Sequence, residues 1–147
     1  MNDIAGAGAI VLDTNVVSEP LKPAPNENVL AYLQQASPRT FVTTVTLAEL
    51  FLGAHQLDAG RRRERLLKNI ATVREVYEQR TLPFTAAAAE HYGQSVAALK
   101  RAGVAISVAD AFIAAICVTS DAALCTRNSN DFVQYPGLSV IDPWAGG

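Results

Sequence analysis

Hydrophobic residues follow two different spacings along the chain, and these spacings separate expected strands from expected helices. Short continuous apolar runs, such as residues 9–12, are typical of buried strands. Apolar positions three and four residues apart, such as Leu66, Ile70 and Val73, indicate a helix. We predict strands at residues 9–12, 41–44, 122–126 and 138–141, an extended piece at 82–84, and helices from near residue 15 and at 27–35, 46–57, 61–79, 86–101 and 107–119.

This alternation of strands and helices predicts an α/β fold with a mainly parallel central sheet flanked by helices. The chain has 147 residues, which is enough for one domain with a buried core. Residues 20–25 are rich in proline, but the stretch is too short to separate two domains. We therefore expect residues 1–147 to form a single domain.

The hydrophobic content also limits the class of protein and its location in the cell. Half of the residues are hydrophobic, which excludes an intrinsically disordered chain. No apolar run reaches the roughly 18 residues needed to span a bilayer. Residues 4–12 are apolar, but no Lys or Arg precedes them, so we do not expect a secretory signal. We expect a cytoplasmic protein with no membrane contact.

Three acidic residues stand alone in apolar surroundings. Asp13 is the only charged residue between positions 3 and 19, and it follows the expected strand at 9–12. Glu49 is the only charged residue between positions 39 and 58, and Asp110 is the only one between 101 and 121. A buried carboxylate needs a cation, a metal or hydrogen-bond donors. A fourth acid, Asp131, follows the expected strand at 122–126.

Each acid also has a purely structural interpretation. Thr46 with Glu49, and Ser107 with Asp110, fit the pattern in which an acid in the first helical turn accompanies an N-cap hydroxyl. Asp13 and Asp131 are each compatible with turns. Taken together, however, the acids fall at strand ends or in first helical turns, which share one edge of a parallel sheet.

Four carboxylates at one edge would repel one another, and a divalent cation relieves that repulsion. Ligation by oxygen alone, without His or Cys, favours Mg²⁺ and also suits Mn²⁺. Such a site is suited to phosphoryl transfer, in which metal-bound water attacks phosphorus.

Four short motifs stand in order along the chain: Val-Leu-Asp-Thr-Asn at 11–15, Thr-Leu-Ala-Glu-Leu at 46–50 with Gly53, Val-Ala-Asp-Ala-Phe-Ile-Ala-Ala at 108–115, and Thr-Arg-Asn at 126–128 leading to Asp131 and Phe132. In this order and spacing they resemble the PIN-domain ribonucleases, and within them the VapC toxins of bacterial type II toxin–antitoxin systems. The segment Asp-Thr-Asn-Val-Val-Ser-Glu-Pro at 13–20 and the ending Ile-Asp-Pro-Trp at 141–144 are most similar to the FitB-like branch. The resemblance covers nearly the whole chain.

The resemblance implies a three-layer PIN-like fold and a Mg²⁺-dependent endoribonuclease acting as a toxin. It also implies an RNA substrate, a cognate VapB-type antitoxin and a homodimer. Asp13 and Asp110 would be the principal metal ligands, with Glu49 and Asp131 acting directly or through water. The family's polar residues at the site fall on Asn15 and Thr126, for which turn and cap chemistry is the alternative interpretation.

The formal net charge of −2 is unusual for a nucleic-acid-binding protein, but the basic residues are concentrated. Seven of the 12 Lys and Arg residues lie in residues 61–80. Arg61, Arg62, Arg63 and Arg65 are candidates to follow an RNA backbone, although a solvated helix face is the more common role. Arg127, beside the expected site, is a single candidate for phosphate contact.

Two other functions remain open from the sequence. A phosphatase of the haloacid-dehalogenase type would use Asp13 as a nucleophile, but that chemistry needs a second Asp where this chain has Asn15. A catalytically inactive PIN-like binding module is the non-enzymatic alternative, and retention of all four acids argues against it. Apolar residues on two helices could form core or a partner groove: Leu30, Tyr32, Leu33, Leu50, Phe51 and Leu57.

Overall fold

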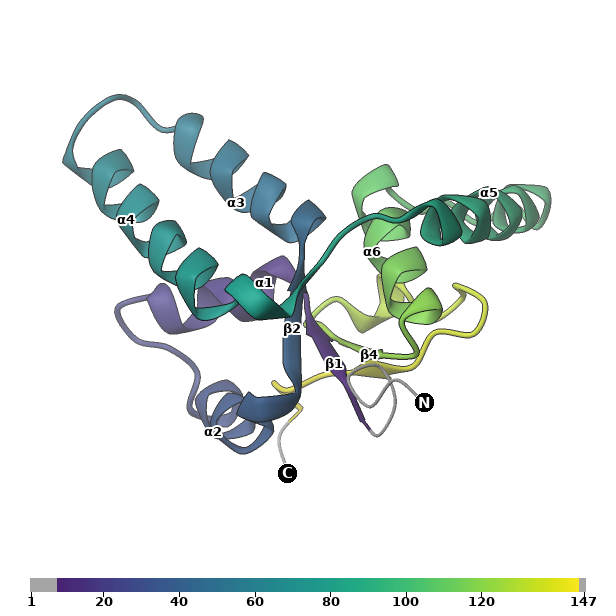
Figure 1. The fold of residues 1–147 in the computed structure, drawn as a ribbon, viewed down its shortest axis with the longest axis horizontal. Helices are drawn as coiled ribbons and strands as arrows, with labels where there is room; N and C mark the ends of the chain where they lie inside the picture. The colour runs from purple at the N-terminus through teal and green to yellow at the C-terminus, as the bar shows by residue number, and fades with distance from the viewer. Residues whose placement is uncertain (1–7, 146–147) are drawn as a thin grey trace.

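The computed structural model describes residues 8–145, and these contain a five-stranded sheet in which every strand pairing is parallel (Figure 1). The strand order is β3-β2-β1-β4-β5, so the first strand is central. The chain adds β2 and β3 on one side of β1 and then β4 and β5 on the other, so the strand order reverses at β1. The expected α/β fold with a parallel sheet is confirmed. The strands are β1 (Ile10–Leu12), β2 (Thr40–Thr43), β3 (Thr81–Leu82), β4 (Ala123–Cys125) and β5 (Val140–Ile141).

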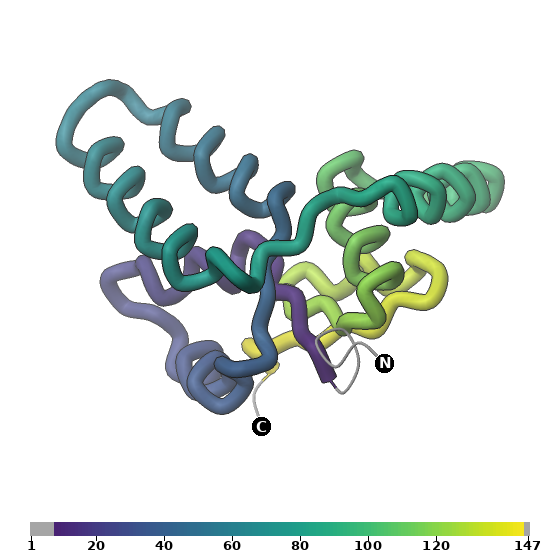
Figure 2. Tube along the Cα trace, viewed as in Figure 1, coloured from purple at the N-terminus to yellow at the C-terminus, as the bar shows by residue number. Residues whose placement is uncertain are grey.

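Helices cover both faces of the sheet and make three layers (Figure 1). Figure 2 shows α3 and α4 as an antiparallel hairpin that extends away from the sheet. The helices are α1 (Thr14–Ser18), α2 (Glu27–Ala36), α3 (Thr44–His55), α4 (Arg61–Val76), α5 (Ala86–Arg101) and α6 (Val108–Thr119), with 3-10 turns at Glu19–Leu21, Ser37–Arg39, Glu78–Arg80 and Ser129–Asp131.

The central strand is apolar on both sides, because each face of the sheet is covered by helices. Val11 points into a core shared with α5 and α6, where Ile113 and Ile116 are buried. Ile10 and Leu12 point into a second core, which α1, α2, α3 and α4 complete. The continuous apolar run at 9–12 thus reflects burial on two faces.

Several element ends differ from the sequence prediction. The helix predicted at 61–79 stops at Val76, and a 3-10 turn follows. The guanidinium of Arg80, in that turn, donates to the backbone carbonyls of Ser37 and Thr40 at 2.9 and 2.7 Å, which ties the end of the helix to β2. Of the extended piece expected at 82–84, only Leu82 belongs to a strand, and of the strand predicted at 138–141, only Val140 and Ile141 do. Residues 4–7 of the apolar stretch at 4–12 lie outside the described residues.

The apolar residues considered for a partner groove are mostly core. Leu50 is buried, and Tyr32, Leu33 and Phe51 pack against the second core. Leu30 is 38% exposed, and Leu57 is half-buried. Within residues 8–145, no helix is both long enough and apolar enough to cross a membrane.

Candidate functional site

Asp13 stands where the strand order reverses, at the carboxyl end of β1. It is the N-cap of α1, and its Oδ1 accepts a hydrogen bond from the backbone amide of Thr14 at 2.8 Å. Its Oδ2 accepts from the hydroxyl of Thr126 at 2.7 Å. Because β1 pairs with β4, the residue after β4 lies beside the residue after β1. Asp13 is only 5% exposed, so these donors compensate for the loss of water around its carboxylate.

Glu49 is joined to Asp13 through Thr14, a residue that we did not predict to contribute to the site. The Thr14 hydroxyl donates to Glu49 Oε1 at 2.6 Å, while the Thr14 amide donates to Asp13. The prediction that Thr46 caps the helix was wrong. Thr43 is the N-cap, and its hydroxyl accepts from the Thr46 amide at 3.0 Å. Glu49 therefore lies beyond the first turn and is not part of a cap.

Asp110 lies in the first turn of α6, and the prediction that Ser107 caps this helix is confirmed. The Ser107 hydroxyl accepts from the Asp110 amide at 3.1 Å. Burial is the main cause that raises the pKa of Asp110 from 3.8 to about 6, against the opposing effect of a hydrogen bond from Ser107. The negative charges of Asp13, Glu49 and Asp131 raise the pKa of Asp110 further, so Asp110 lies within electrostatic range of the other three acids.

The four acids differ in how far they are buried. Asp13 is buried, Glu49 and Asp110 are half-buried, and Asp131 is exposed in its 3-10 turn. Among residues 8–145, no three acidic, His or Cys side chains are already close enough to enclose an ion. An open set of oxygen donors still fits Mg²⁺, which keeps several waters and needs only one or two carboxylates from a protein.

Asn15 and Arg127 shape the loop beside Asp13. The Asn15 amide lies 3.4 Å from Asp13 Oδ2, and its carbonyl oxygen accepts from the Arg127 backbone amide at 3.2 Å. The Thr126 hydroxyl also accepts from the Asn128 amide at 3.1 Å. The exposed guanidinium of Arg127 lies 5.0 Å from the centre of the Trp144 ring, a cation–π contact that holds it near the site.

Glu19 is a second residue that our sequence interpretation missed. It is 4% exposed, Lys22 Nζ lies 2.9 Å from its Oε1, and the Asn26 amide donates to its Oε2 at 2.8 Å. Lys22 and the Asn26 amide lower the pKa of Glu19. This carboxylate therefore closes the proline-rich turn between α1 and α2. An acid three residues before a lysine was the only available signal in the sequence.

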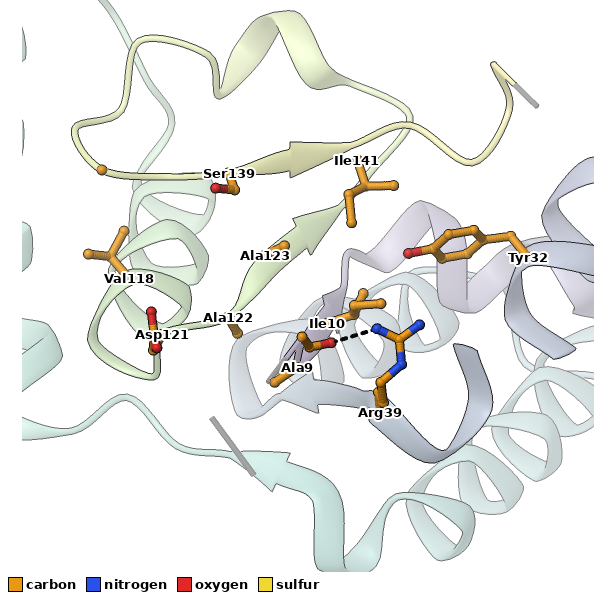
Figure 3. A pocket seen from close by; sticks show the side chains of 12 residues that line it. Ala9, Ile10, Tyr32, Arg39, Val118, Asp121, Ala122, Ala123, Ser139 and Ile141 are labelled. Carbon is orange, nitrogen blue, oxygen red and sulfur yellow. Dashed lines mark hydrogen bonds between the residues drawn. The ribbon is translucent and has the colours of Figure 1, made fainter. Parts of the chain in front are cut away.

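A hollow of about 270 Å³ lies at the opposite edge of the sheet and is separate from the acids (Figure 3). Ala9 and Ile10 line it from the start of β1, and Ala122 and Ala123 from the start of β4. Arg39 closes one side by donating to the Gly8 carbonyl at 3.0 Å. The acidic site at the carboxyl edge and this hollow thus mark opposite ends of the same two strands.

The strand order reverses at β1, directly before Asp13, and residues 10–138 match the PIN domain family. The chain belongs to that family.

Its relatives extend over nearly the whole chain. It is 36% identical to the plasmid stability protein StbB of Pseudomonas syringae pv. tomato and to the VapC ribonuclease Y4jK of Sinorhizobium fredii, over 92% of this chain and 98% and 97% of those proteins. It is 34% identical to the toxin FitB of Neisseria gonorrhoeae over 92% of this chain and 98% of that one. The crystal structure of FitAcB from that organism gives a TM-score of 0.84 at 34% identity, over 92% of this chain and 98% of that one.

Proposed function

We propose that this chain is the ribonuclease toxin of a VapBC-like toxin–antitoxin system and that it hydrolyses RNA phosphodiester bonds with a divalent metal. The observation that carries the proposal is the position of the acids. Thr14 donates to both Asp13 and Glu49. Asp110 lies near enough for the charges of Asp13, Glu49 and Asp131 to add to the effect of burial on its pKa. Membership of the PIN family and similarity to proteins named VapC ribonuclease and toxin FitB support the same function.

In this proposal, Asp13 and Asp110 would be the principal ligands of Mg²⁺ or Mn²⁺, with Glu49 and Asp131 acting directly or through water. When bound, the ion supplies positive charge to a phosphate oxygen and lowers the pKa of water. The chain's own hydroxyls keep two of the carboxylates in place: Thr126 orients Asp13, and Thr14 orients Glu49. Asp110 must be ionised to act as a ligand, which requires a pH above its raised pKa or competition by the metal for its proton.

A cleavage assay on mixed single-stranded RNA tests the proposal. The wild-type chain should cleave RNA in Mg²⁺ and stop in excess EDTA. Asp13→Asn should remove cleavage, because it takes away the charge of a buried ligand without changing the shape of the side chain. Asp58→Asn removes one exposed acid from the loop between α3 and α4 and should cleave like wild type. Full cleavage by Asp13→Asn, or in EDTA, contradicts the metal-nuclease proposal.

The partners follow from the same family. We propose a VapB-type antitoxin, which the toxin name of FitB supports. We also propose a homodimer in the cytoplasm. Copurification with the product of a neighbouring short gene and light scattering of the purified chain test these two points.

The haloacid-dehalogenase alternative is disfavoured, since the position that would hold its second Asp is Asn15, whose side chain instead contacts Asp13 and the Arg127 backbone. An inactive binding module would fold in the same way and fail the cleavage assay.

A further inference from the structure

A groove of about 550 Å³ begins at the candidate site and runs between α3 and α4. Thr14 and Glu49, which belong to the site, line one part of it. Leu50, Leu57 and Leu66 provide apolar walls. The groove is therefore continuous with the acids and is largely apolar beyond them.

The basic residues of α4 do not all face this groove. Arg62 and Arg65 line it together with Leu66 and Asn69, because positions three, four and seven residues apart share one side of a helix. Arg63 is turned toward α3, where its guanidinium lies 3.2 Å from the His55 carbonyl and 3.3 Å from His55 Nδ1. The arginine run thus divides into a pair at the groove and a residue that fastens the α3–α4 hairpin.

The charges on the groove favour a polyanion. Lys22 also lines it but is paired with Glu19 at 2.9 Å. Among residues 8–145, neither Arg62 nor Arg65 forms an ion pair, so both guanidiniums are available to phosphate. A single strand of RNA has phosphates for the arginines and base faces that apolar walls can cover.

We propose that this groove holds the RNA strand adjoining the scissile phosphate, with Arg62 and Arg65 binding its backbone and Arg63 serving the hairpin alone. The inference rests on the proposed ribonuclease function and assigns substrate positioning to two residues outside the acidic site. Because the groove opens at Glu49, a strand bound there leads directly to the carboxylates.

The test measures binding of a fluorescein-labelled, mixed-sequence single-stranded RNA by anisotropy, in an Asp110→Asn background with Mg²⁺ present. Arg62→Gln with Arg65→Gln is compared with Lys68→Gln with Arg74→Gln. The second pair removes the same charge from exposed positions of α4 that do not line the groove. The groove pair should weaken binding at least about tenfold and reduce the slope of log affinity against log salt by about 1.4, which corresponds to two lost phosphate contacts. The control pair should change both quantities much less.

Equal losses in the two pairs would mean that total charge alone governs binding, and would overturn the inference. Unchanged RNA affinity in the groove pair would assign the groove to another ligand, such as a helix of a protein partner, and would also overturn it. A failure limited to this inference leaves RNA cleavage by the wild-type chain intact and equal to that of the groove pair. A failure of the proposed function removes wild-type cleavage itself.

Discussion

Replacing Asp110 with Asn should make the metal-free protein more stable at alkaline pH while removing its activity. The folded protein holds this carboxyl at a pKa of about 6, against 3.8 for an unperturbed Asp. Between these two values the folded chain binds a proton that the unfolded chain has released, so stability falls as pH rises through this window. Above it, the ionised Asp110 is a cost to the folded state that Asn lacks.

The size of the effect follows from opposing contributions. A pKa raised by about 2 corresponds to roughly 3 kcal/mol between the protonated and ionised states. Asp110 is only half-buried, and solvent screening reduces this value by at least half. The substitution also loses a favourable charge near the start of α6, worth roughly 0.5 kcal/mol. We therefore expect a net gain of about 1 kcal/mol, which raises the melting temperature by about 4 °C in a chain of this size.

Thermal unfolding followed by circular dichroism in EDTA measures this difference. The melting temperature of the Asn variant should be higher than that of wild type near pH 8. The two melting temperatures should be equal below about pH 4, where both the carboxyl and the amide are neutral. Asp58→Asn should follow wild type throughout. Added Mg²⁺ should stabilise wild type more than the Asn variant, since an ion that binds only the folded state shifts the transition. A gain of the same size at both pH values, or a loss near pH 8, would refute the electrostatic reasoning. A single transition is expected if the chain is one domain.

Three further substitutions test other parts of the structure. Thr126→Val removes the donor to buried Asp13 and should cost about 1–3 kcal/mol in urea unfolding and also weaken Mg²⁺ binding by calorimetry; unchanged metal affinity would argue against an orienting role. Thr14→Val frees Glu49 and should slow RNA cleavage while leaving the melting temperature nearly unchanged; a lower melting temperature with unchanged cleavage would make Thr14 a structural residue only. Ile70→Ala opens a cavity beneath α4 and should cost about 2–5 kcal/mol in urea unfolding, whereas the exposed Val76→Ala should cost little.

The long helices were predictable because local signals mark both of their ends. The helix predicted at 86–101 has the observed bounds, with the Thr85 hydroxyl accepting from the Ala88 amide at its start. The region before Glu49 was harder, since Thr43, Thr44 and Thr46 each offer a capping hydroxyl. Strand β2 decides among them by fixing where the extended backbone ends, and its last two residues, Val42 and Thr43, pair with β3. Two-residue strands such as β5 are defined by their neighbours rather than by their own sequence.

The acids of the candidate site could be picked out from the sequence for a different reason. A charged residue alone in an apolar segment needs a compensating partner, and the sequence displays that isolation directly. The partners themselves are not visible in the sequence. Thr126 lies 113 positions from Asp13, and Thr14 lies 35 positions from Glu49. These contacts exist only because β1 lies beside β4 and α1 packs near α3, so they required the tertiary structure.

The central position of β1 in the sheet determines when, during synthesis, Asp13 can meet its partners. Its neighbour β4 and the Thr126 hydroxyl come from the last quarter of the chain, whereas Asp13 is among the first residues synthesised. A growing chain that has not yet released residue 126 lacks both the second partner of β1 and the donor that orients Asp13. An incomplete chain that ends before residue 126 therefore carries Asp13 without the hydroxyl that orients it.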